Sequence, residues 1–315
     1  FGQARVSLPG GCAIGSRPID LHLKGLEAMG ATVKIDQGFI DVRSEGRLRG
    51  TKYRFSTVTV TGTENLLMAA AMADGQTILE NCALEPEVND LANFLVSIGA
   101  KISGIGSATL TIDGVEKFSG ADYAVMSDRI EAGTYLAAGV ITRGKVKVTD
   151  IEPQLMQSSL DVFSKMGASV TVGDNWVEVD MHGQRPKAVS FETAPYPHIA
   201  TDMQAQLMAL MTLASGVSKI REKIFENRFM HANELARMGA NISIKGNTAT
   251  VAGVDSLNGA PVMATDLRAS VSLLLAGLAA RGETVINRVY HLDRGYEAIV
   301  EKLTACGAIV ERISE

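Results

Sequence analysis

A chain of 315 residues with 46% hydrophobic and 21% charged residues is long enough for about two domains, each with its own core. Its formal net charge of −5 disfavours a nucleic-acid partner, so a few arginines and backbone amides would hold any anionic ligand. The longest apolar run, residues 271–280, is shorter than the roughly 18 residues that a membrane span needs, which predicts no membrane partner. Three scattered cysteines disfavour both disulfides and a zinc site, and free thiols favour the cytoplasm.

Along the chain, one pattern recurs: an amphipathic helix ends at Gly-Ala and a strand rich in β-branched residues follows. Five glycines mark this pattern at spacings of 68 to 72 residues: Gly30, Gly99, Gly167, Gly239 and Gly307. A second helix, rich in Ala and Leu, alternates with the first and is followed by another set of glycines: Gly75, Gly144, Gly216 and Gly282. Glycine just after a helix favours a left-handed cap. The repeating unit is therefore predicted as β-α-β-α-β-β.

The second helix of each unit is apolar on nearly every side, as in LLMAAAMA at residues 66–73 and in the run at 271–280. Such a helix is predicted to be buried on several sides, which places helices inside and sheets outside. TIM barrels and Rossmann folds bury their strands instead, so both are disfavoured. The predicted fold is α/β, with one domain at residues 1–126 and a second at 127–315.

An acidic or hydroxyl-bearing segment precedes each apolar helix, at residues 61–64, 127–128, 201–202 and 265–266. These side chains can bind the free amides of a first helical turn. If the units are related by rotation, the helix starts converge and form a pocket for phosphate and carboxylate groups. Capping alone explains each segment equally well, and both interpretations stay open.

Several side chains near these segments could carry chemistry. Cys12 lies in a glycine-rich loop, and Arg17, five residues later, would favour its thiolate, although an incidental surface thiol is the alternative. Asp202 could accept a proton from a hydroxyl group. Arg268 could bind a carboxylate through two hydrogen bonds, and Arg294 could reach the same cleft, with ordinary surface ion pairs as the alternative for both.

The other two cysteines receive a structural interpretation, and further polar groups could join the cleft. Cys306 takes the position that Met or Ile holds before Gly-Ala in other units, so we expect it in the core. Cys82 is also expected to be structural. Asp293 could reach the same cleft as its neighbour Arg294, and the FENRF segment, which contains Arg228, supplies further polar groups before a helix.

Seven motifs occur in order: PGGCAIGSRPIDLH, EPEVNDLANFL, RPKAV, TAPYPHIATDMQAQ, FENRFMH, VMATDLRAS and HLDRGYE. Together they resemble the UDP-N-acetylglucosamine enolpyruvyl transferase family, within the EPSP synthase-like superfamily. The resemblance implies a two-domain inside-out α/β barrel built of βαβαββ units with buried helices. It also implies transfer of enolpyruvyl from phosphoenolpyruvate to a nucleotide sugar, at the start of peptidoglycan synthesis.

The resemblance further implies roles for single residues. Cys12 would protonate phosphoenolpyruvate and be alkylated by fosfomycin, and Asp202 would be the base at the sugar 3′-hydroxyl. Arg17 and Arg294 would contact phosphate, and Arg268, with Asp266 beside it, would contact carboxylate. The implied contacts to UDP-N-acetylglucosamine are Arg17, Pro18, Ile19, Asp20, Leu21, Thr57, Val58, Thr59, Val60, Thr61, Gly62 and Ile224. No metal and no organic cofactor is implied.

One departure from the family concerns the start of the chain. The family's first strand, its Lys-Asn pair and a further arginine have no counterpart from Phe1 onward. We therefore expect the 315 residues to be part of a longer chain and to lack activity on their own. Two alternatives stay open: a related transferase acting on shikimate 3-phosphate, which lacks the cysteine loop, and a non-catalytic repeat scaffold.

Overall fold

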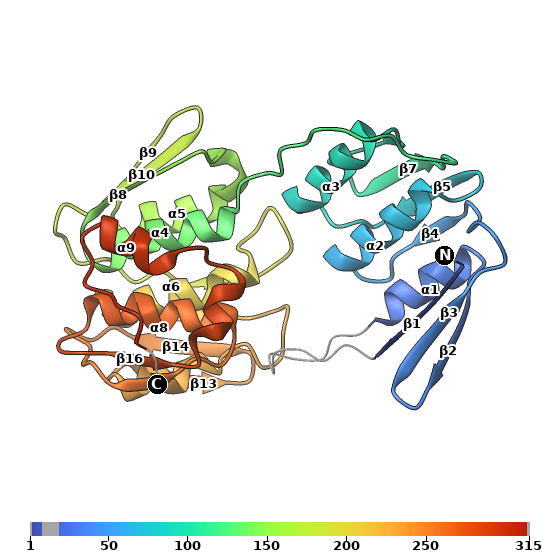
Figure 1. The fold of residues 1–315 in the computed structure, drawn as a ribbon. Coiled ribbons are helices and arrows are strands. Elements are labelled where there is room, and N and C mark those ends of the chain that lie inside the picture. Colours follow the sequence, from blue (N-terminus) through green and yellow to red (C-terminus); the bar gives the residue numbers. More distant parts are fainter. Residues whose placement is uncertain (1, 8–18, 314–315) are drawn as a thin grey trace. The chain divides into compact units, whose positions relative to one another are not determined.

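The computed structural model describes residues 2–7 and 19–313, and these form two compact units (Figure 1). Unit 1 contains the described residues up to Met126, and unit 2 contains those from Ser127 onward. In both units, helices alternate with short strands that pair into small separate sheets. The α/β class predicted from the sequence is confirmed.

Unit 1 holds two sheets, with strand orders β1-β3-β2 and β4-β5-β7-β6. The elements from β4 to β7 follow the predicted β-α-β-α-β-β order, with β4 and β5 parallel and the other neighbours antiparallel. The elements are β1 (Gln3–Ser7), α1 (Asp20–Ala28), β2 (Thr32–Asp36), β3 (Phe39–Arg43), β4 (Lys52–Arg54), α2 (Val60–Ala71), β5 (Gln76–Glu80), α3 (Pro86–Ser97), β6 (Lys101–Ser103) and β7 (Thr109–Asp113).

Unit 2 holds three sheets, with orders β8-β10-β9, β11-β12-β14-β13 and β15-β16. The segment from β11 to β14 is a second complete copy of the predicted repeat. The elements are α4 (Arg129–Ile141), β8 (Lys145–Thr149), η1 (Pro153–Met156), α5 (Gln157–Lys165), β9 (Ser169–Val172), β10 (Trp176–Asp180), β11 (Phe191–Glu192), η2 (Thr201–Met203), α6 (Gln204–Leu213), β12 (Val217–Arg221), α7 (His231–Arg237), β13 (Asn241–Lys245), β14 (Thr248–Ala252), β15 (Pro261–Met263), α8 (Leu267–Ala279), β16 (Val285–Asn287), η3 (Val289–Arg294) and α9 (Ile299–Ala305).

The glycines that mark the repeat end helices as predicted. All five Gly-Ala glycines have φ between +93° and +110°, a conformation that side chains with a Cβ rarely adopt. Among the second set of glycines, Gly144 is an exception, and the prediction for it was wrong. Helix α4 ends with Arg143 in the left-handed conformation, at a φ of 57°, so the turn is made one residue earlier.

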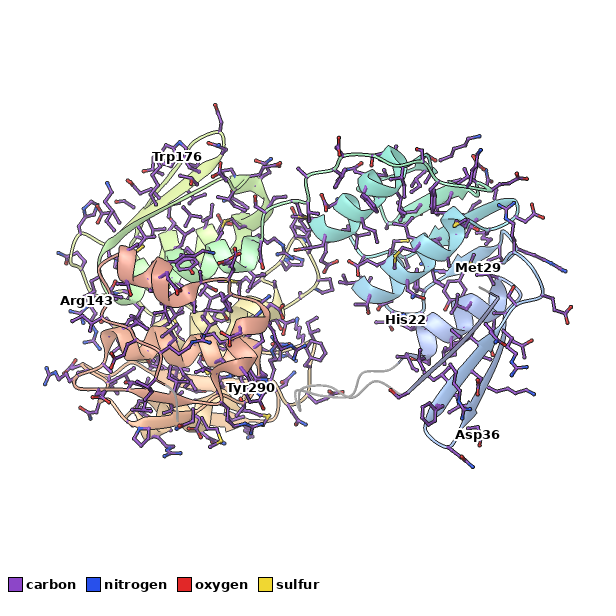
Figure 2. The ribbon with its side chains drawn as sticks, viewed as in Figure 1. His22, Met29, Asp36, Arg143, Trp176 and Tyr290 are labelled. Carbon is purple, nitrogen blue, oxygen red and sulfur yellow. The ribbon has the colours of Figure 1, made fainter. Side chains whose placement is uncertain are left out.

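The predicted hairpins form, and the second strand of each one lies between two neighbours in its sheet. Gln37 and Gly38, both with positive φ, connect β2 to β3 in a two-residue turn. Figure 2 shows Asp36 at the tip of this hairpin and Trp176 on the β9–β10 hairpin of unit 2. The ammonium group of Lys147 lies 3.8 Å from the centre of the Trp176 ring. The turns of these hairpins are exposed, while strands β10 and β14 pack against the central helices α4 and α6.

The central helices of unit 2 are enclosed. Helices α4, α6 and α8 pack against one another, with the β8–β10 sheet on one side and β13 and β14 on the other (Figure 1). Every residue of α6 is buried, so the predicted placement of helices inside and sheets outside is confirmed here. None of the described helices is long and apolar enough to cross a membrane.

The central helix of unit 1 is less enclosed than helix α6 of unit 2. The sequence predicts burial of residues 66–73 on several sides, but Met68 and Met72 are 47% and 43% exposed. Helix α2 packs against α1, α3, β5 and β7, and within the described part of unit 1 no second apolar helix covers its remaining face. Leu66, Leu67, Ala70 and Ala71 are 0% exposed, so burial on several sides is confirmed, and only the side of Met68 and Met72 is open.

The two described cysteines differ in their surroundings. Cys82 is buried, its Sγ donates to the Leu79 carbonyl oxygen at 3.4 Å, and burial raises its thiol pKa to about 11. Cys306 is exposed, so its predicted place in the core was wrong. In the other units a strand follows Gly-Ala, but residues 308–313 form no strand.

Candidate active site

Two of the helix starts in unit 2 are capped by aspartates. Asp128 Oδ1 accepts hydrogen bonds from the backbone N–H groups of Ile130 and Glu131 at 2.8 and 3.0 Å, at the start of α4. Asp266 Oδ1 makes the equivalent bonds at the start of α8, at 2.9 and 3.0 Å. Asp266 is 5% exposed. Helix capping alone explains the hydrogen bonds that Oδ1 accepts in these two aspartates.

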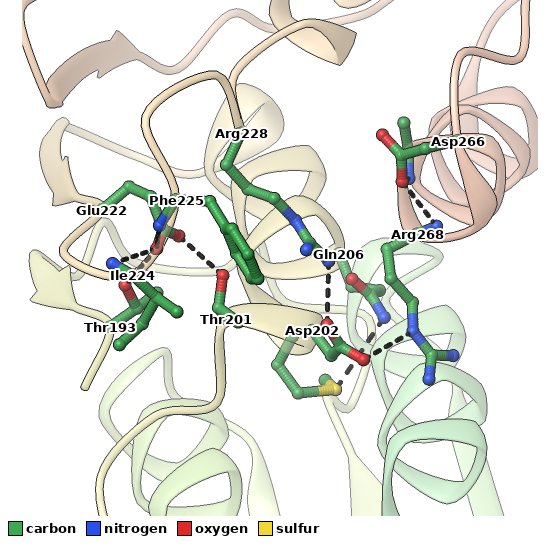
Figure 3. A network of polar contacts seen from close by, with 12 residues as sticks. Thr193, Thr201, Asp202, Gln206, Glu222, Ile224, Phe225, Arg228, Asp266 and Arg268 are labelled. Carbon is green, nitrogen blue, oxygen red and sulfur yellow. Dashed lines mark hydrogen bonds and ion pairs between the residues drawn. The ribbon is translucent and has the colours of Figure 1, made fainter. Parts of the chain in front are cut away.

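Asp202 is used differently from the other helix-start aspartates. Its side chain makes no capping bond, although it stands in the first turn of η2, just before α6. Instead, Oδ1 accepts from Arg228 Nη2 at 2.8 Å and Oδ2 from Arg268 Nε at 3.2 Å (Figure 3). The side chains of Arg228 and Arg268 are only 5% and 12% exposed, whereas that of Asp202 is 40% exposed. Two buried cations thus present a solvent-accessible carboxylate.

The two arginines keep the Asp202 carboxylate charged. Burial by itself would raise the pKa of Asp202, but the nearby charges of Arg268 and Arg228 outweigh it, so the pKa lies below its ordinary value. Burial would lower the pKa of Arg268, yet contacts with Tyr296 and Asp202 raise it. Asp202 is therefore ionised at neutral pH and able to accept a proton, while Arg268 stays cationic.

A buried hydrogen-bond network fixes the position of Arg268. Its Nη1 donates to the Tyr296 hydroxyl at 3.1 Å, and this hydroxyl lies 3.1 Å from Thr134 Oγ1 on α4. Gln206 on α6 donates to the same Thr134 oxygen at 3.2 Å. The network joins α4, α6 and α8 at their N-terminal halves and holds the guanidinium in one orientation.

Sequence reasoning missed two residues of this site. The sequence alone assigns no role to Tyr296, although it stands in the HLDRGYE motif. The sequence predicts Arg228 only as one of the polar groups before a helix. In the structure it makes the shorter of the two ion pairs with Asp202. Its guanidinium also lies 5.5 Å from the centre of the Phe225 ring. Ile224, predicted to contact the sugar, is 40% exposed on the same loop.

Arg294 stands at the end of η3, beside the start of α8. Gly295 packs so closely on Leu267 that a Cβ at this glycine would lie 2.8 Å from Leu267 Cδ2. Arg294 is exposed and makes no ion pair with any described residue. Asp293 behaves otherwise, because its carboxylate is bound by Arg312, at 3.0 Å from Nη1 to Oδ2. Of these two neighbours, Arg294 is the one available to an anionic ligand.

The predicted sugar-nucleotide contacts in unit 1 fall on two adjoining helix starts. Residues 19–21 begin α1, residues 57–62 lead into α2, and the two helices pack against each other. The Tyr53 hydroxyl donates to the Leu21 carbonyl at 3.2 Å, and Thr61 Oγ1 lies 3.4 Å from His22 Nε2. The helix α2 is capped by Thr59, and not by a residue within 61–64 as predicted. Unit 1 thus brings both segments together.

Three predicted site residues, Cys12, Arg17 and Pro18, lie outside the described residues. Within residues 2–7 and 19–313, no group of three or more His, Cys, Asp or Glu side chains is placed to hold a metal ion.

Comparison with known proteins identifies the family. The family profile described as EPSP synthase (3-phosphoshikimate 1-carboxyvinyltransferase) matches residues 1–303. The chain belongs to the EPSP synthase family. Within this family it is similar to the UDP-N-acetylglucosamine 1-carboxyvinyltransferase of Cellvibrio japonicus, with 59% identity over 99% of the chain and 74% of that protein. The enzyme of the same name from Acinetobacter guillouiae is 58% identical over 100% of the chain and 75% of its own length.

Solved structures of the EPSP synthase family have the same fold. The enolpyruvyl transferase NikO from Streptomyces tendae superposes with a TM-score of 0.86 at 28% identity, over 98% of this chain and 74% of that chain. An EPSP synthase from Acinetobacter baumannii superposes with a TM-score of 0.68 at 18% identity, over 96% and 73% of the two chains. The second match supports the fold alone.

Proposed function

We propose that this member of the EPSP synthase family transfers the enolpyruvyl group of phosphoenolpyruvate to the 3′-hydroxyl of UDP-N-acetylglucosamine and releases phosphate, the first committed step of peptidoglycan synthesis. The proposal is supported by relatives at 58% and 59% identity that carry the name UDP-N-acetylglucosamine 1-carboxyvinyltransferase. The structural observation that carries it is the accessible Asp202 carboxylate between two buried arginines. This arrangement provides a base beside cations, as the reaction requires.

Asp202 is the base in the proposed mechanism. It removes the proton of the 3′-hydroxyl as the hydroxyl oxygen forms a bond to C2 of phosphoenolpyruvate, while C3 gains a proton from Cys12. The tetrahedral intermediate then loses a C3 proton, and the C2–O bond to phosphate breaks to regenerate the double bond. The lowered pKa of Asp202 keeps this carboxylate ionised, so a site for the proton is free, although the same two arginines weaken it as a base.

The arginines bind the two anionic groups of phosphoenolpyruvate in the proposed site. Arg268 takes the carboxylate, and Arg294, with Arg17, takes the phosphate. Asp266 caps the helix that presents Arg268 and so fixes the start of α8 beside the substrate. Fixed cations stabilise the charge that develops on phosphate as its bond to carbon breaks.

The sugar nucleotide is assigned mainly to unit 1 in our proposal. Residues 17–21 and 57–62 contact the UDP moiety, and Ile224 contributes from unit 2. Residues 1–126 and 127–315 act as two domains, and substrate binding excludes water from the reacting groups. We further propose a cytoplasmic location, in agreement with the free thiols of Cys82 and Cys306.

A phosphate-release assay with alternative acceptors tests this function. The full product of the gene encoding this chain is mixed with phosphoenolpyruvate and either UDP-N-acetylglucosamine or shikimate 3-phosphate. We expect phosphate release with UDP-N-acetylglucosamine and none with shikimate 3-phosphate. Release with shikimate 3-phosphate alone would transfer the assignment to the other acceptor, and release with neither would support a non-catalytic scaffold.

The cysteine loop gives an independent test of the same function. We predict that Cys12→Ala strongly reduces turnover and abolishes inactivation by fosfomycin, because the loop thiol is both the proton donor and the alkylated group. Cys306→Ala is the matched control, since this exposed thiol lies outside the proposed site. Unchanged turnover and unchanged fosfomycin sensitivity in Cys12→Ala would contradict the proposed mechanism.

A further inference from the structure

A buried carboxylate lies behind the proposed catalytic base. Glu222 directly follows β12 and is only 2% exposed. Its Oε1 accepts from Thr193 Oγ1 at 2.8 Å and from the backbone N–H groups of Ile224 and Phe225 at 2.8 and 3.2 Å. Its Oε2 accepts from Thr201 Oγ1 at 3.0 Å (Figure 3). Four donors from three separate segments therefore converge on one side chain.

The segments that Glu222 joins carry the two sides of the Asp202–Arg228 ion pair. Thr201 is the residue immediately before Asp202, in the 3-10 turn that begins α6. Phe225 stands three residues before Arg228, and its ring contacts that guanidinium. A shift of Glu222 would therefore disturb the turn that carries Asp202 and the loop of Ile224.

The charge of Glu222 is compensated by hydrogen bonds and not by a cation. No Lys, Arg or His nitrogen among the described residues lies within ion-pair distance of its carboxylate, and the neighbouring Lys223 pairs with Glu192 instead, at 2.6 Å. A buried carboxylate in this situation is stable only if its hydrogen bonds are all formed. Loss of any one donor is costly, so the two loops are restricted to one relative position.

We propose that Glu222 is a positioning residue for the transfer reaction: through Thr201 it sets the orientation of Asp202, and through the amides of Ile224 and Phe225 it sets the loop that contacts the sugar. This inference rests on the function proposed above. Glu222 touches no reacting atom in this scheme. The contact with Thr201 governs the chemical step, and the contacts with the two amides govern binding of the sugar nucleotide.

Removal of a single hydroxyl separates these two effects. In the full gene product, Thr201→Val deletes the bond to Oε2 but leaves the loop contacts of Oε1 in place. We expect kcat to fall on the order of tenfold, because a small misplacement of a base slows proton transfer, with KM for UDP-N-acetylglucosamine within about twofold of wild type. Thr201→Ser restores the hydroxyl and should restore most of kcat.

A double-variant comparison tests whether Glu222 acts through Thr201. Glu222→Gln removes the charge with little change in shape, and we expect it to lower kcat by itself. Combined with Thr201→Val, it should lower kcat no further, because the link to Asp202 is already broken. Thr142→Val is the matched control. It deletes a hydroxyl bonded to the Ala138 carbonyl at 2.7 Å, at the far end of α4, and should leave kcat unchanged.

Several results would overturn the inference. These are a Thr201→Val enzyme with wild-type kcat, or kcat losses of Glu222→Gln and Thr201→Val that multiply in the double variant. Equal losses in Thr201→Val and Thr201→Ser would also reject it. A wild-type enzyme that uses another acceptor would refute the proposed function. The same kcat comparison with that acceptor would still decide the role of Glu222.

Discussion

The central helices of the two units have similar sequences but different surroundings. Helix α6 is enclosed by α4 and α8, and each of its residues is buried. Helix α2 of unit 1 leaves Met68 and Met72 nearly half exposed, because its described neighbours cover only part of its surface. Burial of an apolar helix is thus set by how many neighbours it has, and composition alone does not reveal that number.

The candidate site residues of the two units also differ in how they hold charge. In unit 2, Asp202 is bound by guanidiniums that are 5% and 12% exposed. In unit 1, the ion pair of Asp20 and Lys24 has side chains that are 51% and 63% exposed, so solvent weakens it. We infer that unit 2 holds the base of the chemical step and that the described part of unit 1 serves mainly to bind the sugar nucleotide.

Paired carboxylate changes test this division most strongly. Asp202→Asn should lower kcat by about a thousandfold, since a general base contributes between 10² and 10⁴ in rate. Asp20→Asn should raise KM for UDP-N-acetylglucosamine and leave kcat nearly unchanged. Steady-state kinetics of the two variants checks both statements. A large loss of kcat in Asp20→Asn, or none in Asp202→Asn, would reverse the assignment.

Replacement of one methionine in each central helix compares how tightly the two cores are packed. Met208 on α6 is 0% exposed and Met68 on α2 is 47% exposed. Met208→Ala should reduce the free energy of unfolding by about 2–5 kcal/mol, because it leaves a cavity. Met68→Ala should change it by less than about 0.5 kcal/mol. Amide exchange resolves each unit separately, and similar losses at both sites would show that α2 is as enclosed as α6.

An arginine binds the C-terminal end of each central helix. Its replacement should lower the free energy of unfolding by a similar amount in both units. Arg47 donates to three carbonyls in unit 1 at 2.7 to 3.1 Å, and Arg185 does the same in unit 2 at 2.8 to 3.3 Å. Arg185 also pairs with Asp255 at 2.7 Å, but that carboxylate is 95% exposed, so solvent weakens the pair. Arg47→Met and Arg185→Met should each cost about 1.5–3 kcal/mol, the range for hydrogen bonds to a charged group. Amide exchange in each unit measures this. A loss confined to one unit would show that these ends of the repeat differ.

The pH dependence of turnover gives the smallest expected effect. Burial raises the pKa of Asp202 and two arginines lower it, so removal of one cation in Arg228→Met must raise it. The base works only when ionised, so the acidic limb of the kcat/KM profile should move to higher pH. Arg237→Met, at an exposed ion pair 3.4 Å long, is the control. An acidic limb that stays in place or moves to lower pH would show that Arg228 does not tune the base.

Local periodicity made the fold predictable. The glycines after the helices, such as Gly99 and Gly239, adopt the expected left-handed conformation, and two copies of the predicted repeat are complete. Errors arose where a position lacks its usual neighbours. Cys306 matches buried residues of other units in sequence, but no described strand covers it.

The candidate site was only partly predictable, because its contacts join distant segments. Asp128, Asp202 and Asp266 all stand at helix starts, and the sequence does not say which ones serve as caps. What distinguishes Asp202 is its ion pairs with Arg228 and Arg268, which lie 26 and 66 residues further along the chain. No local pattern encodes such pairings, and the resemblance to a family supplied the role of Asp202 instead.

A structure of the full gene product with UDP-N-acetylglucosamine bound would test the central claim most directly. We predict that a carboxylate oxygen of Asp202 lies roughly 2.6–3.2 Å from the 3′-oxygen of the sugar, with Arg228 and Arg268 still holding that carboxylate. A bound sugar whose 3′-hydroxyl faces another side chain, with Asp202 beyond hydrogen-bonding distance, would contradict its assignment as the base.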